Sequence, residues 1–137
     1  MKLNRMHVVL SAELVGRSAE SNAACTAELE SRLVADNWPY DVAEGCYKGR
    51  KEVSFVVQVA SFPEVLMLMR MSQDFEQESV LLVDARNKGY ILYNKRSDMT
   101  ALGRLNESYC DPSSEHVDAY TKIGDTYYYT YNFNREG

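Results

Sequence analysis

Basic side chains, long apolar runs and targeting segments are scarce in this chain of 137 residues. Its 15 Lys and Arg stand against 20 Asp and Glu, for a net charge of −5, and they form no basic stripe. Proteins that bind nucleic acid carry such a stripe or patch, so nucleic acid is not an expected partner. No apolar run approaches the ~20 residues of a membrane span, and no signal peptide precedes the first expected strand. We therefore expect no membrane contact.

Cysteine and histidine are also few. Cys25, Cys46 and Cys110 are odd in number and lack metal-ligand spacing, which favours free thiols in a reducing cytoplasm. His7 and His116 stand far apart, outside any HExxH context. Neither type of glycine-rich phosphate loop occurs. The sequence thus predicts no metal site and no cofactor.

The composition that remains is that of one globular domain over residues 1–137. This length is enough for a hydrophobic core without disulfides or metal. Ten tyrosines are many for so small a domain. Tyrosine suits half-buried interfaces and stacking sites, where an apolar ring carries a polar tip.

The order of the predicted elements indicates an α+β fold. Strands are expected at 6–11, 40–47, 52–59, 80–84 and 90–93, and helices at 21–36 and 61–75. The order β-α-β-β-α-β with an added strand is the signature of a ferredoxin-like split βαβ sandwich. We interpret Ser61-Phe62-Pro63-Glu64 as a capping box that opens the second helix.

The last third of the chain has a weaker pattern. Residues 95–119 are predicted to form a long loop with one helical turn near 115–119, and such a loop is usually functional or contributes to assembly. The tail is predicted to form a strand with one tyrosine-rich face, comprising Tyr127, Tyr129, Tyr131 and Phe133.

Residues 40–53 are the most informative segment, because they predict a hairpin with polar residues at its turn. A four-residue loop over 48–51 would place Tyr47 directly opposite Glu52 on one face of the sheet. The apolar row of the following strand points to the other face, where helices should cover it: Val53, Phe55, Val57 and Val59. Tyr47 and Glu52, together with Val56, should then project from an uncovered face that could meet a ligand or a partner subunit.

Structural alternatives are open for each of these candidates. Tyr47 and Glu52 could form a cross-strand hydrogen bond with no role in chemistry. The run Glu76-Gln77-Glu78 is as expected for a solvated loop between a helix and a strand. Alternation turns Cys46 toward the helix-covered face, which favours a buried structural cysteine over a nucleophile.

The same segments resemble a known family, the phage S-adenosylmethionine lyases, formerly called hydrolases. The resemblance lies in Gly45-Cys46-Tyr47, in Glu52 at the start of a valine-rich strand, and in the block 75–83. Residues 8–12 and 120–125 are similar in position. The resemblance implies catalytic roles for Tyr47 and Glu52, and substrate contacts by Gln77 and Glu78. It also implies a homotrimer similar to the PII signalling proteins, with an open sheet facing inward and active sites at the subunit boundaries.

The function implied by this resemblance is the cleavage of S-adenosylmethionine to methylthioadenosine and L-homoserine lactone, through attack by the substrate's own carboxylate. It would serve phage anti-restriction in the cytoplasm of the bacterial host. Three alternatives are open. Glu52 could activate water in a hydrolase that releases homoserine directly, the chain could be a non-catalytic metabolite-binding trimer, or it could be a small acidic inhibitor acting by protein contact.

Overall fold

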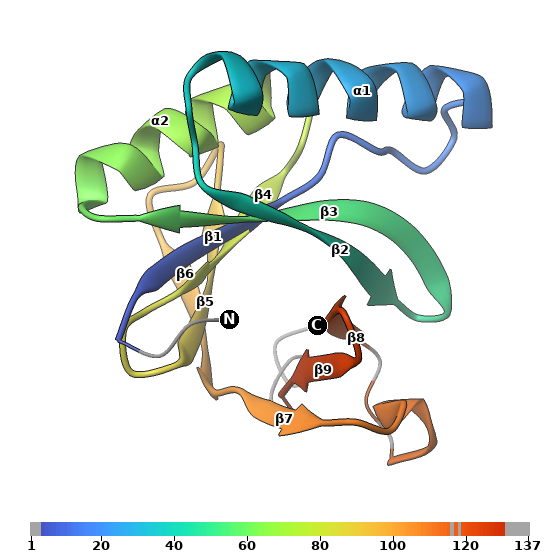
Figure 1. Cartoon of the computed structure of the whole chain (residues 1–137), viewed down its shortest axis with the longest axis vertical. Helices are drawn as coiled ribbons and strands as arrows, with labels where there is room; N and C mark the ends of the chain where they lie inside the picture. Colours follow the sequence, from blue (N-terminus) through green and yellow to red (C-terminus); the bar gives the residue numbers. More distant parts are fainter. Residues whose placement is uncertain (1–3, 116, 118, 131–137) are drawn as a thin grey trace.

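The computed structural model describes residues 4–115, 117 and 119–130. Within them it contains two α-helices and one large antiparallel sheet (Figure 1). The elements are β1 (Met6–Leu10), α1 (Ala19–Ala35), β2 (Tyr40–Tyr47), β3 (Arg50–Val59), α2 (Phe62–Gln73), β4 (Ser79–Val83), β5 (Lys88–Tyr93), β6 (Met99–Arg104), β7 (Asn106–Ser108), the 3-10 turn η1 (Pro112–Glu115), β8 (Ala119–Ile123) and β9 (Thr126–Tyr129).

The nine described strands follow the order β6-β5-β4-β1-β3-β2-β8-β9-β7, and every neighbouring pair is antiparallel. The predicted succession of strands and helices from β1 to β5 is confirmed. None of the described helices is both long enough and apolar enough to cross a membrane.

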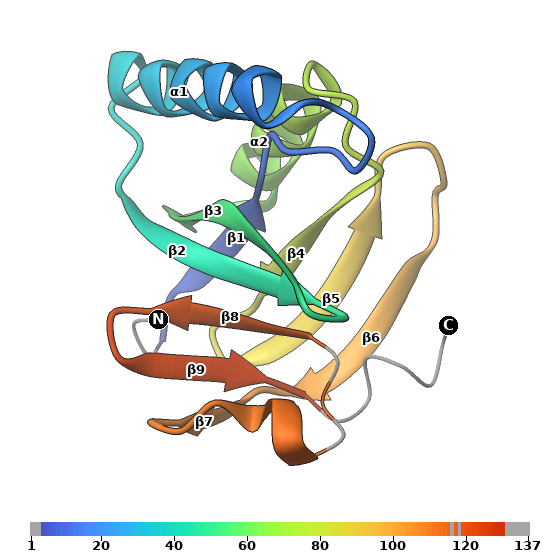
Figure 2. The ribbon, with the colours of Figure 1, turned by 90° about the vertical axis from the view of Figure 1, so that its right-hand side faces the viewer.

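Both helices lie on the same face of the sheet (Figure 2). Helix α1 begins earlier than predicted, because the Ser18 side chain caps it by accepting a hydrogen bond from the Ser21 amide at 3.1 Å. Leu29 and Leu33, one turn apart, are fully buried on its inner side. Their burial ties α1 to the sheet.

The capping box predicted for α2 is wrong. Ser61 makes no side-chain cap bond, although its backbone is extended as at an N-cap. Instead the Glu64 carboxylate accepts a hydrogen bond from the Ala60 amide at 2.6 Å, one residue further out. Pro63 occupies the first turn, where the missing N–H leaves no bond unmade.

The core forms where the helices cover β3, as predicted. Phe55, Val57 and Val59 are at most 4% exposed and share a cluster with residues of α1 and α2. Val53, the first residue of the predicted row, is 39% exposed, so the covered part of the strand begins at Phe55.

The hairpin register differs from the prediction by two residues. Lys48 and Gly49 alone form the turn, both with positive φ (51° and 81°), which is the geometry of a two-residue hairpin loop. Tyr47 consequently pairs with Arg50, and Glu52 pairs with Gly45. Side chains alternate with a period of two, so this shift leaves Tyr47 and Glu52 on the same face.

The long loop predicted for residues 95–119 is wrong. The chain there forms β6, β7 and η1, with β6 paired to β5 and β7 paired to β9. These strands occupy the two ends of the strand order, where burial on one face is incomplete. Their sequences therefore lack the apolar alternation by which a half-buried strand is identified.

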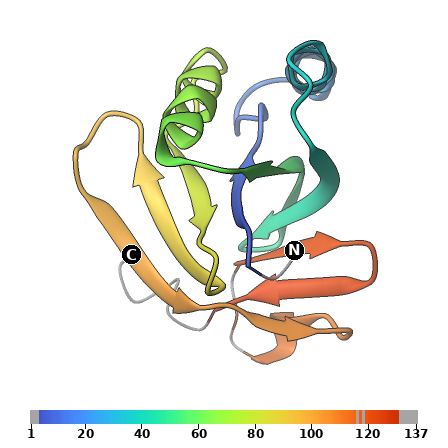
Figure 3. The same ribbon diagram turned by 60° about the vertical axis from the view of Figure 1, so that its left-hand side comes forward.

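The prediction of an uncovered sheet face is also wrong. The sheet curls so that β7, β8 and β9 pass beneath its other face (Figures 2 and 3). The Thr130 hydroxyl donates to the Leu102 carbonyl at 2.8 Å, which joins the end of β9 to β6. Val56, expected on an open surface, is 2% exposed and packs with Val9 and Ala43. The sheet is thus nearly barrel-like, with a concave interior.

The tyrosine-rich face of the tail is confirmed for the described residues. Tyr127 and Tyr129 pack with Val117 and Tyr120 on the outer side of the sheet, and the rings of Tyr120 and Tyr127 meet edge to face with centroids 5.0 Å apart. Tyr131, Phe133 and His116 lie outside the described residues.

Candidate functional site

A cavity of about 220 Å³ lies on the concave side of the sheet. One wall is apolar and comes from β1, β4, β5 and the segment around β6: Val9, Leu81, Ile91, Leu102 and Leu105. The other wall is polar and aromatic and comes from β2, β3, β8 and β9: Tyr47, Glu52, Ser54, Thr121 and Tyr128. Gln77 and Ser79 also line the cavity. Such a space suits a ligand with an apolar side and a few polar or charged groups.

Four lining residues form one straight row across the sheet. Glu52 on β3 is opposite Gly45 on β2, Gly45 is opposite Thr121 on β8, and Thr121 is opposite Tyr128 on β9. Residues that face each other across a ladder share a sheet face. The row therefore runs from a carboxylate to a phenol across two small residues.

Gly45, the first residue of the Gly-Cys-Tyr motif, makes room for its neighbours. A Cβ at this position would stand 2.7 Å from the Ser54 hydroxyl oxygen and 3.5 Å from Cγ of Glu52. Ser54 is buried, at 4% exposed, so its hydroxyl has little space to retreat. The absent side chain keeps the floor of the cavity open beside the carboxylate.

Glu52 is a half-buried carboxylate that forms an ion pair with Arg50. Arg50 Nη1 lies 3.3 Å from its Oε2, and 31% of the Glu52 side chain is exposed. Burial raises the pKa of Glu52 above its ordinary value, and the negative charge of Glu13 raises it further, while Arg50 acts in the opposite direction. A cation bound in the cavity would lower the pKa of Glu52 again, because it stabilises the charged form of the carboxylate.

Glu13, which the sequence analysis did not identify, is part of this site. Its Oε2 accepts a hydrogen bond at 2.6 Å from the Val53 amide, beyond the last β1–β3 pair. Its backbone carbonyl accepts a bond at 3.0 Å from Nε2 of Gln77. Glu13 thus connects β3 with the loop after α2. It lies three residues past a strand and in no motif, so only its position after β1 could have drawn attention to it.

Gln77 lines the cavity, whereas Glu78 does not. The Gln77 amide nitrogen donates to the carbonyls of Glu13 and, at 3.3 Å, Phe75. Glu76 has a positive φ of 61°, which turns the chain just before Gln77. The Glu78 side chain is exposed, and its backbone carbonyl accepts a bond at 2.8 Å from the Asn94 amide.

Tyr47 stands at the rim of the cavity, 45% exposed, at the end of β2. The Lys48 ammonium lies 5.3 Å from the centre of its ring. The structure therefore brings Tyr47, Glu52 and Gln77 to one cavity and leaves Glu78 on the surface nearby.

Cys46 is buried, at 8% exposed, and packs with Val117, Tyr120 and Tyr129 in the outer cluster. The cover over Cys46 is thus formed by the tail and not by the helices, which corrects the prediction. Beside it the Tyr120 hydroxyl donates to the Glu44 carboxylate at 3.0 Å. Among the described residues, no three His, Cys, Asp or Glu side chains are grouped so as to hold a metal ion.

The chain matches a known protein family over most of its length. The family model for the S-adenosylmethionine lyase family matches residues 8–131. The matched range includes the four predicted site residues and all the cavity-lining residues. No curated protein matches the chain.

Proposed function

Because the chain belongs to the S-adenosylmethionine lyase family, we propose that it cleaves S-adenosylmethionine to methylthioadenosine and L-homoserine lactone. The observation that carries this proposal is the convergence of Tyr47, Glu52 and Gln77 on one cavity that is polar on one side and apolar on the other. The substrate has the same two-sided character, with charges on its methionine part and an aromatic base at the far end.

The reaction needs no group from the protein that forms a covalent bond. An oxygen of the substrate carboxylate forms a bond to the γ-carbon, the bond from that carbon to sulfur breaks, and its electron pair goes to sulfur. The products are neutral methylthioadenosine and the lactone, which keeps the ammonium. Since the carboxylate and the sulfonium lose their charges together, the transition state is less polar than the ground state. A water-poor cavity that folds the methionine chain into attack geometry therefore favours the reaction.

The roles of the site residues follow from their positions. Glu52 holds the substrate ammonium, which adds a second cation beside Arg50 and so stabilises the charged form of the half-buried carboxylate. Tyr47 closes the rim over the folded methionine chain, and Gln77, held by two backbone carbonyls, contacts the methionine or ribose part. Glu78 is exposed, so its contact with substrate requires a site that extends to a subunit boundary.

A homotrimer with PII-like assembly is part of the same proposal. The inner strands β4-β1-β3-β2 with two helices on one face support a ferredoxin-like core. The cavity of about 220 Å³ in one copy is below the roughly 300–1,000 Å³ of pockets that enclose ligands of this size, so walls from a second copy would complete it. We further propose that depletion of S-adenosylmethionine in the host cytoplasm serves anti-restriction.

The test is to incubate the purified chain with S-adenosylmethionine in water enriched in heavy oxygen. We expect methylthioadenosine and, at early times, unlabelled lactone, followed by homoserine labelled in its carboxylate, because water opens the lactone at the acyl carbon. Early label in the side-chain hydroxyl would instead establish a hydrolase. Binding without methylthioadenosine would support a metabolite-binding protein, and absence of binding would support an inhibitor that acts by protein contact.

A further inference from the structure

The polar wall of the cavity has two distinct ends. The row Glu52–Gly45–Thr121–Tyr128 crosses three strand-to-strand spacings of about 4.8 Å each, so its ends are about 14 Å apart along the sheet. The curl of the sheet turns both ends toward the same interior (Figure 3). A carboxylate thus faces the cavity at one end and an aromatic ring at the other.

The two residues in the middle of the row project little into the cavity. Gly45 has no side chain and Thr121 has a short one, so no long side chain from the middle of the row stands between Glu52 and Tyr128. Across the cavity, the side chains of Leu81 and Ile91 are hydrocarbon and carry no charge, whereas Gln77 and Ser79 supply neutral polar groups, so the charged group of the lining is Glu52. The row therefore offers an elongated ligand a carboxylate for its cation at one end and a ring for its planar base at the other.

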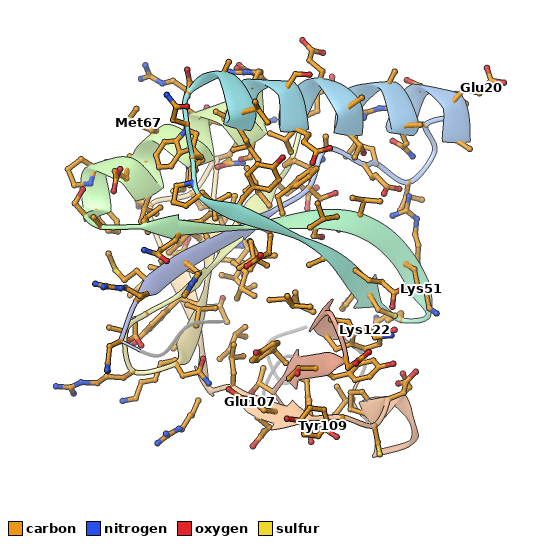
Figure 4. All side chains as sticks on the ribbon, viewed as in Figure 1. Glu20, Lys51, Met67, Glu107, Tyr109 and Lys122 are labelled. Carbon is orange, nitrogen blue, oxygen red and sulfur yellow. The ribbon has the colours of Figure 1, made fainter. Side chains whose placement is uncertain are left out.

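Tyr128 has the character of a stacking platform. It is half-buried, and burial raises its pKa, with Glu107, Tyr109 and Asp41 adding to the effect. Glu107 pairs directly with Tyr128 across β7 and β9, and Figure 4 shows Glu107 and Tyr109 together at this end of the molecule. A tyrosine phenol is neutral at physiological pH even at its ordinary pKa of about 10, so the ring presents an uncharged face to a base.

We infer that Tyr128 stacks on the adenine of the substrate and that S-adenosylmethionine lies along the row from Glu52 to Tyr128. This inference rests on the proposed function, because it assigns the two ends of that substrate to the two ends of the row. It makes Tyr128 a specificity residue for the nucleoside part, separate from the residues that hold the methionine part.

Two probes separate the ends of the site. Methylthioadenosine carries the base but no ammonium, and S-methylmethionine carries the sulfonium and the ammonium but no base. Calorimetric titration of the full chain measures each. We expect Tyr128→Ala to weaken methylthioadenosine binding about 10- to 100-fold, the range that loss of base–aromatic stacking implies, and to leave S-methylmethionine binding unchanged. Tyr128→Phe should keep the affinity for methylthioadenosine.

Two further variants make the result decisive. Glu52→Gln should show the reverse pattern, with S-methylmethionine weakened and methylthioadenosine retained. Tyr109→Ala is the matched control, because this tyrosine is 83% exposed and does not line the cavity. If Tyr128→Ala fails to fold, Tyr128→Leu preserves an apolar side chain without the aromatic plane and should lose the same affinity.

The inference is overturned if the parent chain does not bind methylthioadenosine, if Tyr128→Leu or Tyr128→Ala binds it as tightly as the parent, or if both probes weaken equally. Cleavage is measured separately. Tyr128-dependent binding without cleavage would remove the proposed function and leave the inference standing, whereas cleavage without Tyr128-dependent binding would do the opposite.

Discussion

The substitution Gly45→Ala probes the floor of the cavity with a single methyl group. That methyl would stand 2.7 Å from the Ser54 hydroxyl oxygen, closer than real Cβ contacts, inside a site where Ser54 is 4% exposed. Overpacking of this kind costs about 1–3 kcal/mol. Alanine also reduces the conformational freedom of the unfolded chain. Where the native backbone suits alanine, as in this strand, that raises the free energy of unfolding by about 0.4–1 kcal/mol and offsets part of the cost.

The net expectation is a free energy of unfolding lower by about 1–2 kcal/mol. For a chain of this length, that corresponds to a fall in Tm of roughly 3–10 °C. Urea and thermal unfolding should be compared at one fixed protein concentration, because oligomerisation makes Tm depend on concentration. Cleavage should fall further than stability explains, since the methyl also occupies the floor beside Cγ of Glu52, at 3.5 Å.

Two matched variants test the cause. Ser54→Ala removes the hydroxyl oxygen that the new methyl group would contact. In that background Gly45→Ala should lower the free energy of unfolding by at least about 0.5 kcal/mol less, which is the size of coupling found between residues in contact. Gly89→Ala adds a methyl to another buried strand glycine, but its nearest neighbour would be Cδ2 of Leu105 at 3.4 Å, and no loss of stability is expected. A Gly45→Ala protein as stable as the parent, or an equal cost in both backgrounds, would refute the steric explanation.

Three further predictions concern the charged site and the assembly. Tyr47→Phe and Glu52→Gln should each lose at least about 90% of cleavage activity, or roughly 1.4 kcal/mol of transition-state stabilisation, while still folding cooperatively. Full activity of Glu52→Gln would remove the role of this carboxylate. The pKa of Glu52 is raised by burial and by Glu13, so the acid limb of kcat/KM should move to lower pH in Glu13→Gln and stay in place in the exposed control Glu20→Gln. The raised pKa also makes stability depend on pH, because the folded state binds the Glu52 proton more tightly than the unfolded state does. The free energy of unfolding should fall as pH rises from about 4.3, the unfolded value, through the raised pKa of Glu52. This dependence should disappear in Glu52→Gln. Light scattering at micromolar concentration should give the mass of a trimer, and a monomer mass would exclude a site shared between subunits.

Much of the core follows from local sequence. The alternation of apolar residues from Phe55 to Val59 predicts both a strand and the face that the helices cover, because side-chain direction has a period of two along any strand. The four-residue spacing of Leu29 and Leu33 predicts the buried stripe of α1 for the equivalent reason in a helix. The common face of Tyr47 and Glu52 is predictable as well, and it survives an error of two residues in the register.

Tertiary structure alone decided the rest. The curl that turns an open face into a cavity depends on strands β6 to β9 and on the bond from Thr130 to the Leu102 carbonyl, between residues 28 positions apart. The approach of Glu13 to Glu52 depends on where β1 stops pairing with β3, leaving the Val53 amide for a side chain to satisfy. Local patterns report which face a residue takes, because that is a property of the backbone repeat. They do not predict which distant strand closes over that face, because this depends on contacts between segments far apart in the sequence, and a local repeat carries no information about such contacts.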